Sequence, residues 1–170
     1  MAYIPGKPLA MLNIIKYYIK TKMSNKSFLR GVDIVLTYDC NLKCKHCNTF
    51  TMISKEKKVL SLSDYKKIEK QLTKMGVFQY CFTGGEPLLN KNFEKIIKIF
   101  KPFKRVMLVQ TNGLLIKKYK DAQHLKNIGI DIVNLSLDSG IGIEHNDNRG
   151  VPKHFEKTIK AIKFCKKAGL

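Results

Sequence analysis

The chain has 170 residues, the length of one ordinary domain or of part of one. Hydrophobic residues make up 44% and charged residues 26%, which excludes a disordered tail because enough apolar side chains are present to bury a core. The formal net charge is +19, but only three of the 32 basic residues are arginines, so the planar guanidinium group that reads bases and phosphates is scarce. We therefore expect a solvated, lysine-rich surface and no specific nucleic-acid partner, with contact between part of this surface and an anionic partner as the alternative.

The five cysteines do not form the pattern of a secreted disulfide framework. Their number is odd and three of them fall within eight residues, which indicates a reducing compartment. The amino-terminal apolar stretch is interrupted by Asn13 and Lys16, which argues against a signal peptide. No apolar run approaches the roughly 20 residues that span a bilayer. We expect a cytoplasmic protein without a transmembrane segment.

The first predicted element is a helix over residues 9–19. Its apolar side chains recur at helical spacing, at Leu9, Leu12, Ile15, Tyr18 and Ile19. The favoured interpretation is a helix that packs on the rest of the fold. The alternative is an interfacial helix that places Lys16, Lys20 and Lys22 at lipid headgroups. We assign residues 1–30 to an amino-terminal helical extension and residues 31–170 to the core.

Strands and helices then alternate along the core. The predicted strands cover residues 32–37, 77–82, 105–110 and 130–137, and the predicted helices cover residues 63–74, 90–100, 119–128 and 152–167. Ser61 or Ser63 would cap the first of these helices. Such alternation predicts an α/β fold with parallel strands and right-handed helical crossovers. Functional sites in such folds gather beyond the carboxyl ends of the strands.

A cysteine motif follows the first predicted strand. The segment CNLKCKHC places Cys40, Cys44 and Cys47 in a CxxxCxxC spacing, and three thiolates in one loop can hold a soft metal centre. The alternative is a structural zinc site with His46 or a distant residue as the fourth ligand. Zinc sites are usually built from two CxxC pairs, and only one is present. The spacing therefore favours an iron site with three protein ligands and an open fourth position.

The other three strands are followed by segments that combine glycine with polar side chains. These segments are TGGEP at residues 83–87, TNG at residues 111–113 and SLDS at residues 136–139. Adjacent glycines let a ligand approach the bare backbone. Taken alone, each segment is equally typical of a tight turn or a helix cap.

In this order, CNLKCKHC, TGGEP, TNG and SLDS resemble the radical S-adenosylmethionine (radical SAM) enzymes over residues 32–170. The flanking YDCNLKCKHC and the later HNDNRG resemble most the branch of molybdenum-cofactor-type enzymes and of peptide-modifying, SPASM-type enzymes. The resemblance implies a partial (βα) barrel of parallel strands. This chain would hold about four of its six βα units, without strands five and six.

The resemblance also implies the cofactors. Cys40, Cys44 and Cys47 would bind three irons of a 4Fe-4S cluster, and the fourth iron would chelate S-adenosylmethionine. Reductive cleavage would give a 5′-deoxyadenosyl radical that abstracts a hydrogen atom from an unknown substrate, a peptide or a small molecule. An electron donor such as flavodoxin or ferredoxin would reduce the cluster.

Seven further positions match the family's S-adenosylmethionine contacts, namely Gly84, Gly85, Glu86, Asn112, Ser136, Asp138 and Arg149. By the resemblance, the glycines would offer backbone groups to the methionine amino end, and the glutamate would fix their turn. The serine and the first aspartate of SLDS would contact ribose or carboxylate. The arginine would pair with the methionine carboxylate, which suits a planar guanidinium group.

The remaining cysteines and histidines are expected to be structural. Cys81 lies within the second predicted strand and Cys165 on the last predicted helix, where thiols pack as small apolar groups. His124, His145 and His154 have no partner spacing, so surface or capping roles are expected.

Three hypotheses follow. The first is a radical SAM enzyme, or the part of one that binds the cluster and S-adenosylmethionine, with the barrel completed by a further polypeptide as one possibility. The second is a non-catalytic iron–sulfur or zinc module, or an inactive fragment of such an enzyme. The third is a basic nucleic-acid-associated protein whose metal is structural.

Overall fold

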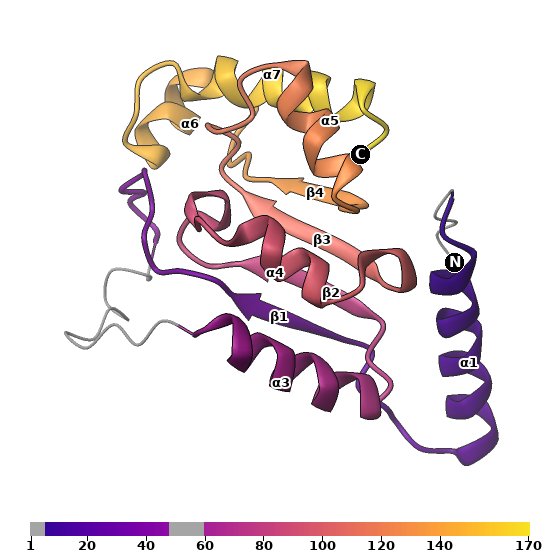
Figure 1. Ribbon diagram of the computed structural model, residues 1–170. Helices are drawn as coiled ribbons and strands as arrows, with labels where there is room; N and C mark the ends of the chain where they lie inside the picture. Colours follow the sequence, from indigo (N-terminus) through magenta and orange to yellow (C-terminus); the bar gives the residue numbers. More distant parts are fainter. Residues whose placement is uncertain (1–5, 48–59) are drawn as a thin grey trace.

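The computed structural model describes residues 6–47 and 60–170, which form one four-stranded sheet and the helices around it (Figure 1). The strands are β1 (Gly31–Val35), β2 (Gln79–Thr83), β3 (Val106–Thr111) and β4 (Ile132–Leu135). All neighbouring strands are parallel, and their order in the sheet is β1-β2-β3-β4. The predicted parallel α/β fold is confirmed, with each strand within a few residues of its expected position.

Helices follow each strand, as expected. They are α3 (Leu62–Lys74), α4 (Phe93–Ile99), α5 (Tyr119–Asn127), α6 (Gly142–Arg149) and α7 (His154–Lys167), with short 3-10 helices η1 (Pro87–Leu89) and η2 (Pro102–Lys104). Ser61 caps α3, because its side chain accepts the Asp64 N–H while the Asp64 carboxylate accepts the Ser61 N–H. The sequence did not predict α6, although Gly150 at its carboxyl end, with φ of 70°, is a common helix-stop signal.

The main core lies between the sheet and the helices α3, α4, α5 and α7. Phe100 follows α4 and is fully buried, and the rings of Tyr65, Tyr80 and Phe82 lie around it at centroid distances of 5.0 to 6.4 Å. Successive side chains of a strand alternate between the two faces of a sheet. The alternate residue Cys81 therefore lies on the opposite face, where it is partly exposed. The helices thus stabilise one face of the sheet and leave its carboxyl edge free for ligands.

The amino-terminal helix α1 (Pro8–Ser24) lies at the amino ends of the strands (Figure 1). Ile14 packs on Phe78 and Val106, and the Lys7 Nζ lies 2.7 Å from the buried Asp131 carboxylate, which fixes the start of the helix. The predicted helix that packs on the fold is confirmed. However, the five side chains whose spacing predicted it, Leu9, Leu12, Ile15, Tyr18 and Ile19, are all exposed. The helix is apolar on two opposite sides. One side carries these five exposed side chains, and the side that carries Ile14 packs on the core.

Within residues 6–47 and 60–170, no helix combines the length and apolarity needed to cross a bilayer. The division into residues 1–30 and 31–170 stays a prediction.

Candidate functional site

The predicted site residues gather at the carboxyl ends of the strands. A cavity of about 190 Å³ opens there between the cysteine loop and the segments that follow β2, β3 and β4. Eight of the ten predicted site residues line it, namely Cys40, Cys44, Cys47, Gly84, Gly85, Asn112, Ser136 and Arg149. The other two, Glu86 and Asp138, contact lining residues directly. The spacing along the chain therefore does place these residues together.

The two glycines bring the end of β2 against the backbone that leads into the cysteine loop. Gly85 N–H donates to the Thr37 carbonyl at 2.7 Å. A Cβ added at Gly84, which has φ of +140°, would lie 2.2 Å from the Thr37 oxygen, and one at Gly85 would lie 2.3 Å from the Asp39 oxygen. No side chain fits at either position. Glycine is thus required for packing between two backbones, and the ligand approach that the sequence suggested stays a prediction.

Glu86 joins the ends of β2 and β3. Its side chain is fully buried and accepts hydrogen bonds from the Thr111 hydroxyl at 2.8 and 2.9 Å, from the Asn112 N–H at 2.9 Å and from the Leu88 N–H at 3.1 Å. Burial raises the pKa of Glu86, and the hydrogen bonds oppose this rise. The carboxylate therefore holds the GGEP and TNG turns in fixed relation.

Asn112 carries this connection to the cysteine loop. Its Nδ2 donates to Asn41 Oδ1 at 2.7 Å and lies 3.9 Å from Cys40 Sγ. The Cys40 thiol is half-buried, and burial raises its pKa ahead of a smaller effect from the Glu86 charge. Asn112 thus connects the Glu86 carboxylate, through its backbone N–H, to the Cys40 thiol, through its side-chain amide.

The helix α6 brings a cation to the second cysteine. Arg149 Nη2 donates to the Asp138 carboxylate, and Arg149 Nη1 lies 3.7 Å from Cys44 Sγ. The Lys45 N–H donates to the Asn148 carbonyl at 2.9 Å, which fixes α6 against the cysteine loop. Arg149 Nε is buried and has no hydrogen-bond partner in the described part of the chain. The arginine thus retains a free donor beside the cavity, which suits an anionic ligand group.

Two histidines support the segment that holds Asp138, so the expected surface or capping roles of His145 and His154 are wrong. Both side chains are fully buried, and His145 Nε2 lies 2.6 Å from His154 Nδ1. The Asp138 N–H donates to His145 Nδ1 at 3.2 Å. His145 therefore carries its proton on Nε2 and donates to His154, so the pair fits only as neutral imidazoles. Burial lowers the pKa of both rings, that of His154 to about 4.

Other expectations on single residues are also resolved. His124 lies on the surface, with Nε2 3.5 Å from Glu94, and Cys165 is buried in the main core, as expected. Cys81 is only partly buried, and burial together with the Asp33 charge raises the pKa of its thiol to about 11.

The donor set around the cavity fits an iron–sulfur cluster. All three loop cysteines are free thiols, and thiolates are the ligands of such clusters. Among the described residues, no three His, Cys, Asp or Glu side chains converge on a single ion. An iron–sulfur cluster does not need the three thiolates to converge on one ion, because each thiolate binds a different iron.

The model of the Radical SAM superfamily matches residues 34–170. The chain belongs to this superfamily. It is 39% identical over 140 residues to a probable GTP 3′,8-cyclase of Methanococcus maripaludis strain C6, covering 78% of this chain and 46% of the relative. It is 35% identical over 130 residues to molybdenum cofactor biosynthesis protein 1 of Dictyostelium discoideum, covering 73% of this chain and 20% of the relative.

Solved structures of the superfamily share its fold. Native anSMEcpe with bound AdoMet matches this radical SAM protein with a TM-score of 0.67 and 26% identity, covering 83% of this chain and 41% of that one. The predicted family and its partial barrel are confirmed. The chain spans less than half the length of each of these relatives. The ligand roles of the individual site residues stay predictions.

Proposed function

We propose that this radical SAM protein binds a 4Fe-4S cluster through Cys40, Cys44 and Cys47 and binds S-adenosylmethionine in the adjoining cavity. One observation carries the proposal. The three thiols and five of the seven other predicted positions line a single cavity of about 190 Å³ at the carboxyl ends of the strands. Ligands of parallel α/β folds bind at this edge.

When bound, the cluster and S-adenosylmethionine supply a one-electron cleavage of the C5′–S bond that yields methionine and a 5′-deoxyadenosyl radical. The protein contributes binding and geometry. The backbone of Gly84 and Gly85 lines the cavity and would bind the methionine amino end, where no glycine side chain obstructs it. Arg149, which lines the cavity and is held by Asp138, would bind the methionine carboxylate through its planar guanidinium group. Asn112 and Ser136, which also line the cavity, would offer polar groups to the rest of the cofactor.

We further propose that the radical abstracts a hydrogen atom from an unactivated carbon of a peptide or a small molecule. A small redox protein such as flavodoxin or ferredoxin is the proposed electron donor, because each turnover consumes one electron. A further polypeptide that completes the barrel remains part of the proposal, since the described residues supply four parallel strands.

Anaerobic reconstitution with iron and sulfide tests the proposal. We expect the wild-type chain and its Cys165→Ala variant to take up iron, and the Cys44→Ala variant to lose the cluster spectrum. Cys165 is a matched control because it is a free cysteine buried in the core, away from the cavity. Addition of S-adenosylmethionine should alter the electron paramagnetic resonance signal of the dithionite-reduced cluster, and 5′-deoxyadenosine should accumulate.

The alternative is a module that holds a cluster or zinc without turnover. A cluster whose signal does not respond to S-adenosylmethionine and that yields no 5′-deoxyadenosine favours this alternative. Equal iron uptake by the Cys44→Ala and wild-type chains would contradict both.

A further inference from the structure

The helix α1 presents an apolar stripe to solvent on the side that faces away from the sheet. Leu12, Ile15, Ile19 and Met23 are spaced three or four residues apart, so they lie on one side of the helix. Their exposed fractions are 49%, 44%, 52% and 82%. The opposite side is already used, because Ile14 packs on the core. We call these four residues the outer stripe. A helix that is apolar on both sides normally buries both.

Lysines flank the outer stripe, and no acidic residue accompanies them. By helical geometry, Lys16 and Lys20 lie on one side of it and Lys22 on the other, and all three are exposed. The first acidic residue of the sequence is Asp33, so α1 carries no carboxylate to neutralise them. Lysine stems extend along apolar surface while their ammonium groups stay accessible, and the Lys20 Nζ lies over the Phe28 ring, 4.1 Å from its centroid. This combination is typical of helices that lie in the interface of a bilayer.

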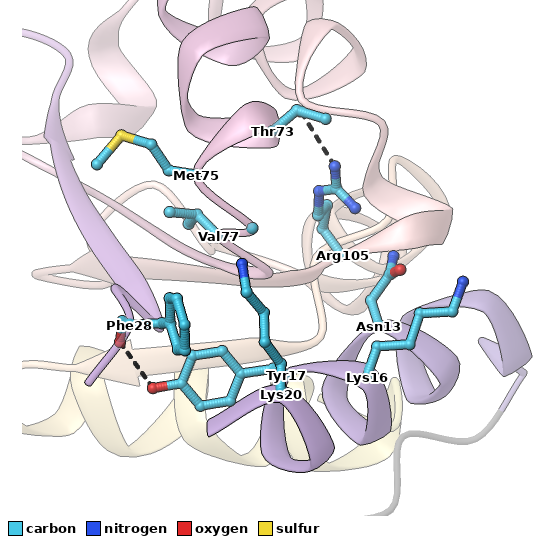
Figure 2. Close-up of a pocket in the computed structure, with 10 residues that line it drawn as sticks. Asn13, Lys16, Tyr17, Lys20, Phe28, Thr73, Met75, Val77 and Arg105 are labelled. Atoms are coloured by element: carbon cyan, nitrogen blue, oxygen red, sulfur yellow. Dashed lines mark hydrogen bonds between the residues drawn. The ribbon is translucent and has the colours of Figure 1, made fainter. Parts of the chain in front are cut away.

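A cavity of about 240 Å³ opens beside these lysines, between α1 and the amino end of the sheet (Figure 2). Lys16 and Lys20 line it from α1, and Arg105 lines it from the core. Arg105 is buried, its Nη2 donates to the Thr73 hydroxyl, and its Nε has no hydrogen-bond partner within residues 6–47 and 60–170. None of the described residues that line this cavity is acidic. A concave, cationic site with a free buried donor suits a phosphate group.

We propose that α1 binds the protein to the surface of an anionic membrane. The outer stripe enters the headgroup layer, the lysines contact lipid phosphates, and the cavity at Arg105 receives one headgroup phosphate. A second copy of the chain is a poor occupant of this surface, because it carries the same lysines and a net charge of +19. The surface lies at the opposite end of the strands from the cysteine loop (Figure 1). Membrane binding is therefore independent of the cluster and of S-adenosylmethionine.

Flotation of the 170-residue protein with lipid vesicles tests the outer stripe. We expect binding to vesicles that contain phosphatidylglycerol and little binding to phosphatidylcholine alone. The double variant Ile19→Ser/Met23→Ser should lose binding. The matched control is Ile141→Ser/Ile143→Ser, whose side chains are 58% and 83% exposed outside α1, and it should bind like the wild type. Circular dichroism should show both variants folded, since all four side chains are exposed.

The lysines are tested in the same assay. Lys16→Gln/Lys20→Gln should weaken binding to the anionic vesicles by about thirtyfold, whereas Lys163→Gln/Lys166→Gln, exposed on α7, should change it little. Three outcomes would overturn the proposal. These are absence of flotation, an equal loss in the two lysine variants, and a dimer in sedimentation that Ile19→Ser/Met23→Ser dissociates without any vesicle binding.

Discussion

Replacement of Glu86 should measure how strongly one buried carboxylate holds the two turns of the candidate site together. The side chain is fully buried and accepts hydrogen bonds from the Leu88 N–H, the Thr111 hydroxyl and the Asn112 N–H. In Glu86→Gln, one oxygen becomes an NH₂ group that faces a backbone N–H. We expect a loss of about 2 kcal/mol in the free energy of unfolding, the cost of one unsatisfied buried donor. Glu86→Ala leaves all three donors without an acceptor and creates a cavity, so about 4 kcal/mol should be lost.

The pH dependence gives the same experiment a second readout. Burial raises the pKa of Glu86 in the folded protein above its ordinary value of 4.5. The ordinary value applies to the unfolded chain, so between the two pKa values the folded chain binds the proton more tightly than the unfolded chain does. The free energy of unfolding therefore falls as pH rises from the lower to the higher pKa. Glu86→Gln cannot titrate. The difference in unfolding free energy between wild type and this variant should therefore diminish as pH rises from 4.5.

Urea unfolding followed by circular dichroism measures both effects. The matched control is Glu156→Gln, an exposed glutamate in the first turn of α7, which should leave the urea midpoint nearly unchanged. The reasoning is refuted if Glu86→Ala lowers the midpoint no more than this control does. A stability difference between wild type and Glu86→Gln that does not vary with pH would contradict the assigned pKa direction.

Three further predictions concern the surroundings of the site. Gly84→Ala should cost about 3 kcal/mol or more in urea unfolding, because the added Cβ would lie 2.2 Å from the Thr37 oxygen at φ of +140°, whereas Gly140→Ala meets nothing within 4 Å and should be neutral. Arg149→Lys should weaken S-adenosylmethionine binding to the reconstituted protein by about tenfold in calorimetry, since the planar fork is lost, and an unchanged Kd would exclude the assigned role. Burial, followed by the charges of neighbouring groups, lowers the pKa of His154 from 6.5 to about 4, so the unfolded chain takes up the proton first. The free energy of unfolding should therefore fall by up to about 3 kcal/mol as pH is lowered from 6.5 to 4. The same dependence of stability on pH in the His154→Asn variant would contradict this.

The strands and the cysteine loop could be predicted because their signals are local. Each apolar run that forms a strand is followed directly by turn residues, as at Phe82 and Gly84. The buried side of α1 could not be predicted in this way. Periodicity detects a stripe such as Leu12 and Ile19 but does not say which of two apolar sides contacts the core.

Contacts between distant residues account for what was missed at the site. His145 and His154 lie on different helices, and their pairing depends on how α6 turns back onto α7. The spacing of two histidines along the chain carries no such information. Likewise, the motif predicted that Glu86 fixes its own turn, whereas its bonds to Thr111 and Asn112 arise only because β2 and β3 are neighbours in the sheet.

The sequential strand order has a consequence for synthesis of the protein on the ribosome. Each strand pairs with the one made just before it, as β2 pairs with β1 and β3 with β2. Such a sheet has no pair that must wait for a strand made much later, so its contact order is low for a parallel sheet. Each βα unit can therefore dock on the nascent chain as soon as it emerges. The cysteine loop belongs to the first of these units, so it can pack against the GGEP turn before the segment that carries Arg149 has been translated.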